Sequence, residues 1–342
     1  MLNIGVIGCG YWGPNLVRNF SQIKECNVLW CSDLSDDRLQ QIKEIYPRVK
    51  TTKNYMEVIE DKNVDAVAIA TPVSTHFELA KTALQNNKHV LVEKPLADNS
   101  EHAKELIEIA EKNKKIMMVD HTFEYASAIN KIKGVLEAGE LGKLFTIDMI
   151  RVNLGLFQKD INVVWDLAPH DISILLFLLG RMPTSVKADG MAYILENIED
   201  DAHITLKFPD KITTHMHVSW LDPLKIRKTT IVGNKKMLVY DDTEQTEKIK
   251  IFDKGVTLEK NNLPKDEYYA TWEEFRLVYR RGEAKVPVLD NKEPLNVMCR
   301  HFAECIKNNK KPLSDGLSGL RVVQVIEAIQ ESLRSKGKDV FL

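Results

Sequence analysis

Residues 4–13 of the chain read IGVIGCGYWG, an apolar run followed directly by three spaced glycines. The run Ile4–Ile7 is short and rich in Val and Ile, which is typical of a strand buried on both faces. In the GxGxxG pattern that follows, Gly8 permits a tight turn, Gly10 lets a pyrophosphate approach the backbone, and Gly13 lets the next helix pack closely against the strand. The stretch therefore predicts a dinucleotide-binding turn between a first strand and a first helix.

Short apolar runs and helical patterns alternate through the first third of the chain. Strands are predicted at residues 4–7, 28–31, 65–70, 89–92 and 116–119, with a weaker one near 49–51, and helices at 15–24, 36–45, 54–60, 76–87 and 100–113. Strands that alternate with helices imply right-handed crossovers and a doubly wound parallel sheet. Residues 1–122 are therefore predicted to form a complete Rossmann domain in an α/β protein.

The remainder, residues 123–342, follows a different pattern and is predicted to form a second domain. Helical patterns lie at 127–138, 166–179, 294–308 and 317–335, strands near 143–153, 184–194, 201–208, 212–220, 226–233 and 236–240, and a loop or edge hairpin over 241–265. A run of strands joined by turn signals indicates a largely antiparallel sheet.

Composition narrows the class of protein. At 342 residues the chain is long enough for about two domains, and its formal charge of −2 gives no electrostatic case for binding nucleic acid. It has no apolar stretch of about 18 residues that would indicate a membrane span, and its start predicts a strand rather than a signal peptide. Its five cysteines lack CxxC spacing, which predicts free thiols, a cytoplasmic location and no structural zinc site.

Further cofactor ligands are expected around the glycine turn. Tyr11 and Trp12 lie inside it, and Asp33 follows Gly13 by 20 residues, at the end of the second strand, where a carboxylate binds the adenosine ribose hydroxyls. That carboxylate would repel a 2′-phosphate, which favours NAD over NADP. Arg38 is open to two interpretations, since it would hold such a phosphate or simply lie over the adenine.

Two more strands end in polar residues at the same edge of the predicted sheet, where ligands of such folds bind. Thr71 and Pro72 end the fourth strand, and His76 follows, either as a cofactor ligand or as a helix cap. Glu93 and Lys94 end the fifth strand. Lys94 is placed to stabilise a developing alkoxide, although the tripeptide EKP by itself is also typical of a surface turn.

Asp166 and His170 precede a very apolar helical pattern and, four residues apart, share one helix face. Three interpretations stay open: a metal pair, for which no third ligand is evident, a structural Asp–His pair, or an acid–base pair in which the carboxylate orients the imidazole.

Together, the terminal GxGxxG, Ala70-Thr71-Pro72 with His76, Glu93-Lys94-Pro95 and Asp166-xxx-His170 resemble the Gfo/Idh/MocA oxidoreductases over nearly the whole chain. The resemblance implies a Rossmann domain, a C-terminal α/β domain with a large, open, mainly antiparallel sheet, and hydride transfer between a sugar-type carbinol and NAD(P).

The resemblance also implies catalytic roles. Lys94 would contact the reacting hydroxyl, Asp166 would bind substrate hydroxyls and support the imidazole, and His170 would take the proton as base, although members of the family differ in whether Lys or His transfers it. The chain departs from many members by lacking a glycine-rich run before Asp166 and by having Pro169 before His170. The expected substrate is a nucleotide sugar of the UDP-N-acetylhexosamine type, oxidised at C3, with a PLP aminotransferase as pathway partner.

Two alternatives are a dehydrogenase of free sugars or inositol, and a non-catalytic NAD(P)-binding regulator. The regulator should have lost Lys94 or the Asp–His pair, and this chain retains them. The resemblance further implies a homodimer or homotetramer associated through the second sheet.

Position alone suggests further substrate ligands. Tyr125 follows the sixth strand and is predicted either to bind a sugar or to pack as a hinge aromatic. Arg151 and Asn153 alternate on one strand face, where Arg151 would hold a diphosphate or pair with an acidic neighbour. His215 and His217 also share a strand face, but no third ligand is evident, so no metal site is expected.

Overall fold

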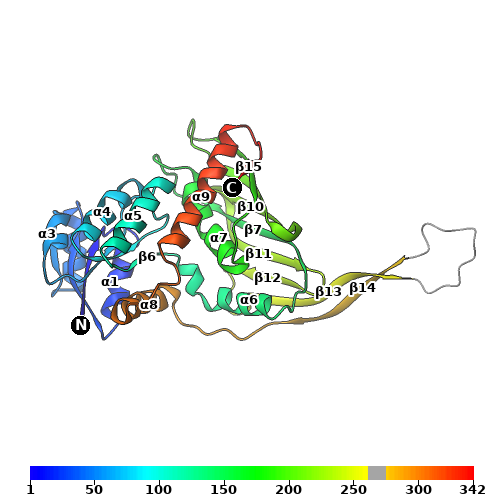
Figure 1. Ribbon diagram of the computed structural model, residues 1–342, viewed down its shortest axis with the longest axis horizontal. Helices are drawn as coiled ribbons and strands as arrows, with labels where there is room; N and C mark the ends of the chain where they lie inside the picture. The colour runs from blue at the N-terminus through cyan, green and yellow to red at the C-terminus, as the bar shows by residue number, and fades with distance from the viewer. Residues whose placement is uncertain (261–274) are drawn as a thin grey trace, which may run out of the picture. The chain divides into compact units, whose positions relative to one another are not determined.

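The computed structural model describes residues 1–260 and 275–342, which form two compact units (Figure 1). The first unit comprises Met1–Ser127, Ile172–Phe177 and Asn291–Ala328, and the second comprises Ala128–Asp171, Leu178–Asp290 and Ile329–Leu342. Residues 291–328, which the sequence prediction placed with the second domain, thus belong to the first unit.

The first unit is built on a six-stranded sheet in the order β3-β2-β1-β4-β5-β6, and every neighbouring pair is parallel. This is the doubly wound Rossmann order, in which ligands bind at the carboxyl ends of the strands. The strands are β1 (Leu2–Ile7), β2 (Cys26–Ser32), β3 (Lys50–Thr52), β4 (Ala66–Ile69), β5 (His89–Val92) and β6 (Met117–Val119). The fold class predicted for this part of the chain is confirmed.

Helices pack on both faces of this sheet. Its helical segments are α1 (Gly13–Ser21), α2 (Asp36–Ile45), α3 (Tyr55–Glu60), η1 (Val73–Thr75), α4 (His76–Gln85), α5 (Ser100–Lys112), η2 (Thr122–Tyr125) and α8 (Pro294–Asn308). On one face Ile4 and Val6 join a core with α1 and α8, where Phe20 and Phe302 lie 6.3 Å apart. On the other face Val58 of α3 fills the space over Gly5. The apolar face of α8 therefore explains why this late segment joins the first unit.

The second unit is built on a nine-stranded sheet in the order β14-β13-β12-β11-β7-β10-β9-β8-β15. Among the described strands of this sheet, only β7 and β10 pair in parallel, so the predicted mainly antiparallel sheet is confirmed. The strands are β7 (Leu144–Leu154), β8 (Ser185–Met191), β9 (Asp201–Lys207), β10 (Thr213–Ser219), β11 (Leu221–Gly233), β12 (Met237–Asp241), β13 (Ile249–Lys260), β14 (Phe275–Lys285) and β15 (Val340–Phe341).

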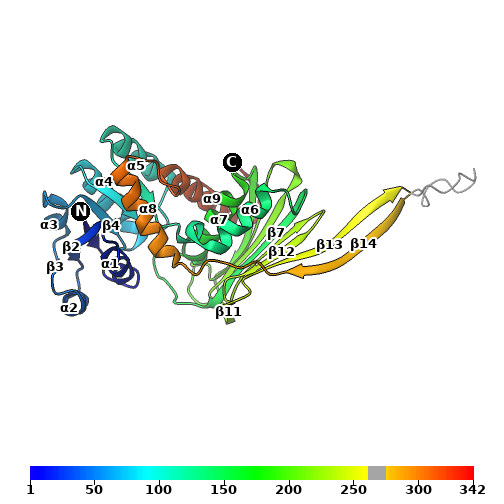
Figure 2. The same ribbon diagram turned by 90° about the horizontal axis from the view of Figure 1, so that it is seen from below.

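Strands β13 and β14 form a long hairpin ribbon at one edge of this sheet and extend past the end of β12 (Figure 2). Of the loop or edge hairpin predicted over 241–265, Asp241 ends β12, residues 242–248 connect it to β13, and β13 runs up to Lys260, whereas residues 261–265 lie outside the described residues. The remaining helical segments are α6 (Ser127–Glu137), α7 (Val163–Leu179), η3 (Pro209–Lys211) and α9 (Gly316–Arg334). Within the described ranges, no helix has the length and apolar composition needed to cross a membrane.

Candidate functional site

The glycine turn between β1 and α1 has the geometry that its sequence predicts. Gly8 has φ +92°, and a Cβ there would overlap the carbonyl oxygen of Ala70. A Cβ on Gly13 would overlap the carbonyl oxygen of Gly8 and lie 2.9 Å from its carbonyl carbon. At Gly10 the only heavy atom within 4 Å of such a Cβ is Arg38 Nη1, at 3.8 Å. Gly8 and Gly13 therefore close the turn, whereas Gly10 keeps space open over it.

The start of α1 is suited to bind an anion. Pro14 occupies its first turn, and the Trp12 side chain makes no capping hydrogen bond. Backbone N–H groups at a helix start carry partial positive charge and need acceptors, which the oxygens of a pyrophosphate provide. Tyr11 is 82% exposed and packs edge-on against Trp12, with ring centroids 5.5 Å apart.

Asp33 lies beside this turn at the end of β2 and is held in place by backbone amides. Its Oδ2 accepts a hydrogen bond from Cys9 N at 2.7 Å, and its Oδ1 accepts one from Ser35 N at 2.9 Å. Its side chain is only 8% exposed, and Nη1 of the exposed Arg38 lies 3.5 Å from Oδ2. A fixed carboxylate at this point is what the ribose hydroxyls of NAD require.

His76, the first residue of α4, has a different role from the predicted cofactor contact. It is buried, and its Nδ1 and Nε2 each lie 2.8 Å from a backbone carbonyl oxygen, of Pro95 and Thr71 respectively. Burial lowers the pKa of His76, while its hydrogen bonds to the two carbonyl groups oppose that shift. It thereby ties the ends of two strands together. Thr71 Oγ1 accepts a hydrogen bond from Thr75 at 2.7 Å, and Pro72 is exposed.

Two buried carboxyl groups flank Lys94 at the carboxyl edge of the parallel sheet. Glu93 follows β5 and Asp120 follows the neighbouring β6. Burial raises the pKa of Glu93, and the negative charge of Asp120 raises it further, while Lys94 opposes that rise. Burial likewise raises the pKa of Asp120. The two carboxyl groups also interact with each other through a side-chain hydrogen bond, which raises the pKa of Glu93 further. They therefore form a buried pair beside Lys94.

His121 lies next to this carboxyl pair and stays uncharged. It is 1% exposed, and burial together with Lys94 lowers the pKa of His121 to about 3. Neither ring nitrogen has a hydrogen-bond partner within the described part of the chain. Sequence reasoning missed Asp120; the available signal was an acidic residue directly after the apolar strand Met117–Val119.

The second unit carries the Asp–His pair in the first turns of α7. Asn162 caps this helix, since its Oδ1 accepts a hydrogen bond from Trp165 N at 3.2 Å. Asp166 Oδ2 accepts a hydrogen bond at 2.9 Å from Nε1 of Trp220, which is buried. His170 lies one turn further on, so the two side chains share a face of α7. The tryptophan fixes the carboxylate that the sequence predicted to support the imidazole.

Arg151, a predicted diphosphate ligand, is instead part of a buried ion pair. Its Nε and Nη2 donate to Asp171 at 3.0 and 2.7 Å, and both side chains are at most 5% exposed. A guanidinium held in this buried bidentate pair is not presented to a substrate, and the pair is the acidic-neighbour alternative that the sequence left open. Asn153, two residues along β7, is half-buried.

Tyr125, predicted to bind a sugar or to pack, is packed in the first unit. It is 8% exposed, its hydroxyl lies 3.1 Å from Ser314 Oγ, and its ring centroid lies 5.5 Å from that of His301. Burial raises the pKa of Tyr125. Its polar atom is therefore engaged within the protein.

The fold and these residues define a nicotinamide-dinucleotide oxidoreductase. The open space at Gly10 and the anchored Asp33 carboxylate fit a dinucleotide lying along the carboxyl edge. Residues 2–121 match the family model "Oxidoreductase family, NAD-binding Rossmann fold", and residues 129–239 match the "GFO/IDH/MocA C-terminal domain". The chain belongs to the GFO/IDH/MocA family, and its first unit carries an NAD-binding Rossmann domain.

Relatives with two kinds of substrate are similarly close. The chain is 31% identical over 224 residues to a myo-inositol 2-dehydrogenase of Thermotoga maritima, covering 60% of this chain and 65% of the relative. It is 28% identical over 201 residues to a UDP-N-acetylglucosamine 3-dehydrogenase of Acidithiobacillus ferrooxidans, covering 58% and 61%. In both alignments the chain spans less than two thirds of the relative. A solved structure of the latter enzyme has a TM-score of 0.80 at 22% identity, covering 98% of each chain, and shows the shared fold.

Proposed function

We propose that this chain oxidises a secondary alcohol of a sugar or cyclitol with NAD as hydride acceptor. The observation that carries the proposal is the carboxyl edge of the parallel sheet. The strands of this one sheet end in the open Gly10 turn, in the anchored Asp33 and in Lys94 with its buried carboxyl neighbours. Dinucleotides bind at this edge of such sheets, and Lys94 adds a positive charge that can stabilise negative charge on a reacting oxygen.

Each catalytic side chain has a distinct task in this proposal. His170 takes the hydroxyl proton as the C–H bond breaks, and Asp166, held by Trp220, orients the imidazole and binds a substrate hydroxyl. The Lys94 ammonium offsets the negative charge that develops on the oxygen. NAD supplies the electron sink when bound, because its nicotinamide ring accepts the hydride. The products are a ketone, the reduced cofactor and one proton.

The first substrate candidate is a UDP-N-acetylhexosamine oxidised at C3, which the similarity to the UDP-N-acetylglucosamine 3-dehydrogenase supports. The 3-keto product would be the substrate of a PLP-dependent aminotransferase. A second candidate is a free inositol, which one structural observation favours: Arg151, the residue expected to bind a diphosphate, is buried against Asp171.

A substrate panel tests the proposal. Untagged protein is assayed for NAD reduction with UDP-N-acetylhexosamines, their uronic acids, free hexoses, myo-inositol and scyllo-inositol, with an aminotransferase and amino donor added to remove a 3-keto product. Turnover with a UDP-sugar alone supports the first candidate, and turnover with inositols alone supports the second. Tight NAD binding without turnover on any of them contradicts the proposal and favours a regulator.

Variants test the residue roles in the same assay. Lys94→Ala and His170→Ala should each lower kcat by about 100-fold or more while NAD binding persists, because each group acts on the reacting hydroxyl. His215→Ala, which removes an exposed imidazole on β10, is the matched control and should turn over normally. Near-normal kcat in Lys94→Ala or His170→Ala would remove that residue from the mechanism.

A further inference from the structure

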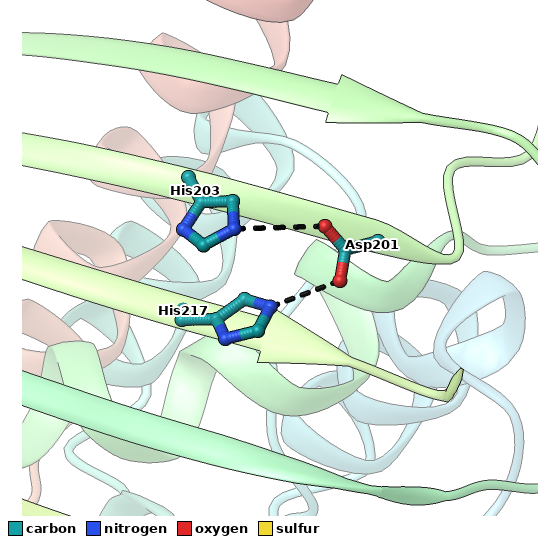
Figure 3. A group of neighbouring side chains, drawn as sticks. All are labelled: Asp201, His203 and His217. Atoms are coloured by element: carbon teal, nitrogen blue, oxygen red, sulfur yellow. Dashed lines mark hydrogen bonds and ion pairs between the residues drawn. The ribbon is translucent and has the colours of Figure 1, made fainter. Parts of the chain in front are cut away.

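Three metal-binding side chains gather on β9 and β10 of the second sheet. Asp201 and His203 lie two residues apart on β9 and share one face of the strand. His217 of β10 is the direct cross-strand partner of His203. Figure 3 shows both imidazoles turned toward the Asp201 carboxylate. Sequence reasoning paired His217 with His215 along one strand and found no third ligand, because the other two residues belong to the neighbouring strand.

The ligand atoms are close enough to share one ion. His217 Nε2 lies 2.9 Å from Asp201 Oδ2, and His203 Nε2 lies 3.8 Å from Asp201 Oδ1. All three ligand atoms lie within 4.8 Å of one another. Two ligands bound at about 2.0–2.1 Å on a tetrahedral zinc ion are about 3.3 Å apart. The two distances from the Asp201 carboxylate to the imidazoles bracket that separation, so these spacings suit one shared ion.

The two imidazoles are already arranged in parallel. Their rings are stacked with centroids 4.0 Å apart and an interplanar angle of 11°, and both face Asp201, so the rings need only tilt toward each other for the two Nε2 lone pairs to meet at one ion. The paired strands fix this arrangement, since the register runs without interruption from Thr213 opposite Lys207 to Ser219 opposite Asp201. Ligands on paired strands hold their geometry better than ligands on loops.

The carboxylate is also well positioned. The preceding residue, Asp200, is buried, and its Oδ2 accepts hydrogen bonds from Tyr193 N at 2.9 Å and Ile194 N at 2.8 Å. Its backbone carbonyl accepts a hydrogen bond from Trp220 N at 2.9 Å. These bonds anchor the start of β9 and leave little backbone freedom at Asp201.

The site is open to solvent on one side. The His203 side chain is 68% exposed, whereas those of His217 and Asp201 are 28% and 25% exposed. An ion can therefore enter from solvent and keep a water molecule as its fourth ligand. Two imidazole nitrogens and one carboxylate oxygen suit Zn²⁺ and its neighbours Co²⁺, Ni²⁺ and Cu²⁺, whereas Mg²⁺ and Ca²⁺ prefer all-oxygen sites.

We propose that Asp201, His203 and His217 form a zinc-binding site that clips β9 to β10 on the exposed face of the second sheet. The ion replaces the hydrogen bond between His217 and Asp201, because imidazole and carboxylate must both be deprotonated to coordinate it. The site is separate from the proposed chemistry on α7 and does not depend on the proposed function.

Zinc titration of the untagged, metal-stripped full chain tests the site directly, with a chromophoric chelator as competitor. We expect one Zn²⁺ per chain, and a Kd about 100-fold weaker in His203→Ala, His217→Ala and the conservative Asp201→Asn. The matched control is His215→Ala, which removes an exposed imidazole on the same face of β10, where its Nδ1 lies 3.3 Å from Thr205 Oγ1. This variant should bind zinc like the parent chain.

Thermal unfolding provides a second readout. Zinc should raise the Tm of the parent chain and of His215→Ala and leave the Tm of the three ligand variants unchanged, because only a bound ion stabilises the native state. Circular dichroism establishes that each variant is folded. The proposal is overturned if the parent chain binds no zinc, if the ligand variants keep its Kd, or if His215→Ala loses binding to the same extent.

Discussion

Two glycines of the same turn should respond in opposite ways to a single added methyl group. A Cβ on Gly13 would overlap the carbonyl oxygen of Gly8 and lie 2.9 Å from its carbonyl carbon, and both are backbone atoms that cannot rotate away. A Cβ on Gly10 would meet only Arg38 Nη1, at the ordinary contact distance of 3.8 Å. Gly13→Ala should therefore lower the stability of the fold, whereas Gly10→Ala should weaken the binding of NAD.

The magnitudes follow from these contacts. Overpacking at Gly13 costs about 1–3 kcal/mol, offset in part by up to about 1 kcal/mol from the better helix propensity of alanine. We expect a net loss of about 1–2 kcal/mol in the free energy of unfolding. For Gly10→Ala we expect a change below about 0.5 kcal/mol. Its methyl group would occupy the space over the turn and weaken NAD binding at least tenfold, which corresponds to about 1.4 kcal/mol.

Urea unfolding without cofactor and NAD titration by calorimetry separate the two effects. Gly10→Ala with unchanged stability and weakened NAD binding would support the assignment of the turn. A Gly10→Ala variant that binds NAD like the parent chain would refute it. A Gly13→Ala variant as stable as the parent would show that the close approach of α1 to the turn is not needed.

Three further predictions concern the cofactor, acid sensitivity and the buried ion pair. Asp33→Ala should lower the ratio of kcat/KM for NAD over NADP at least tenfold, because the carboxylate that repels a 2′-phosphate is gone; an unaltered ratio would mean that another group binds the ribose. Burial lowers the pKa of His89 to about 4, and its Nδ1 accepts a hydrogen bond from Ile116 N at 2.9 Å. As pH falls, His89 therefore takes up a proton in the unfolded chain before it does so in the folded chain. Its contribution to the free energy of unfolding is fully present above about pH 6.5 and is lost toward pH 4, a loss of about 2 kcal/mol after allowing for partial exposure. His89→Asn, which keeps an acceptor, should flatten this part of the pH–stability curve, and an equally steep curve would contradict the assignment. Arg151→Met should lower the free energy of unfolding by about 3–5 kcal/mol, and adding Asp171→Leu should restore much of it; a stable Arg151→Met with a raised KM for a nucleotide sugar would return Arg151 to the substrate site.

The fold could be predicted from the sequence because strands, helices and turns leave local patterns in it. The GxGxxG turn and the alternating strands and helices determine a doubly wound sheet, and turn-separated strands determine an antiparallel one. The same logic placed Asp33 and Lys94 at the carboxyl edge, since Asp33 directly follows β2 and Lys94 lies two residues after the end of β5. Positions that depend only on the end of a strand are therefore predictable from sequence.

Roles that depend on a distant partner were not predictable. Arg151 is satisfied by Asp171 on a helix, and Tyr125 by Ser314, 189 residues away. His76 is bound to carbonyl groups at the ends of two strands, which no side-chain pattern reveals. In each case the residue type suggested contact with a substrate or cofactor. In the structure the side chain is buried and bonded to a specific partner within the protein instead.

The most direct test of the account is to follow the hydride itself. The protein is incubated with NAD and a substrate deuterated at the carbinol carbon, taken from the best member of the panel, and the reduced cofactor is analysed by mass spectrometry. We expect the deuterium to appear in the reduced nicotinamide, and we expect Lys94→Ala to suppress its transfer while NAD remains bound. Reduced cofactor that carries no deuterium, or transfer at the parental rate in Lys94→Ala, would contradict it.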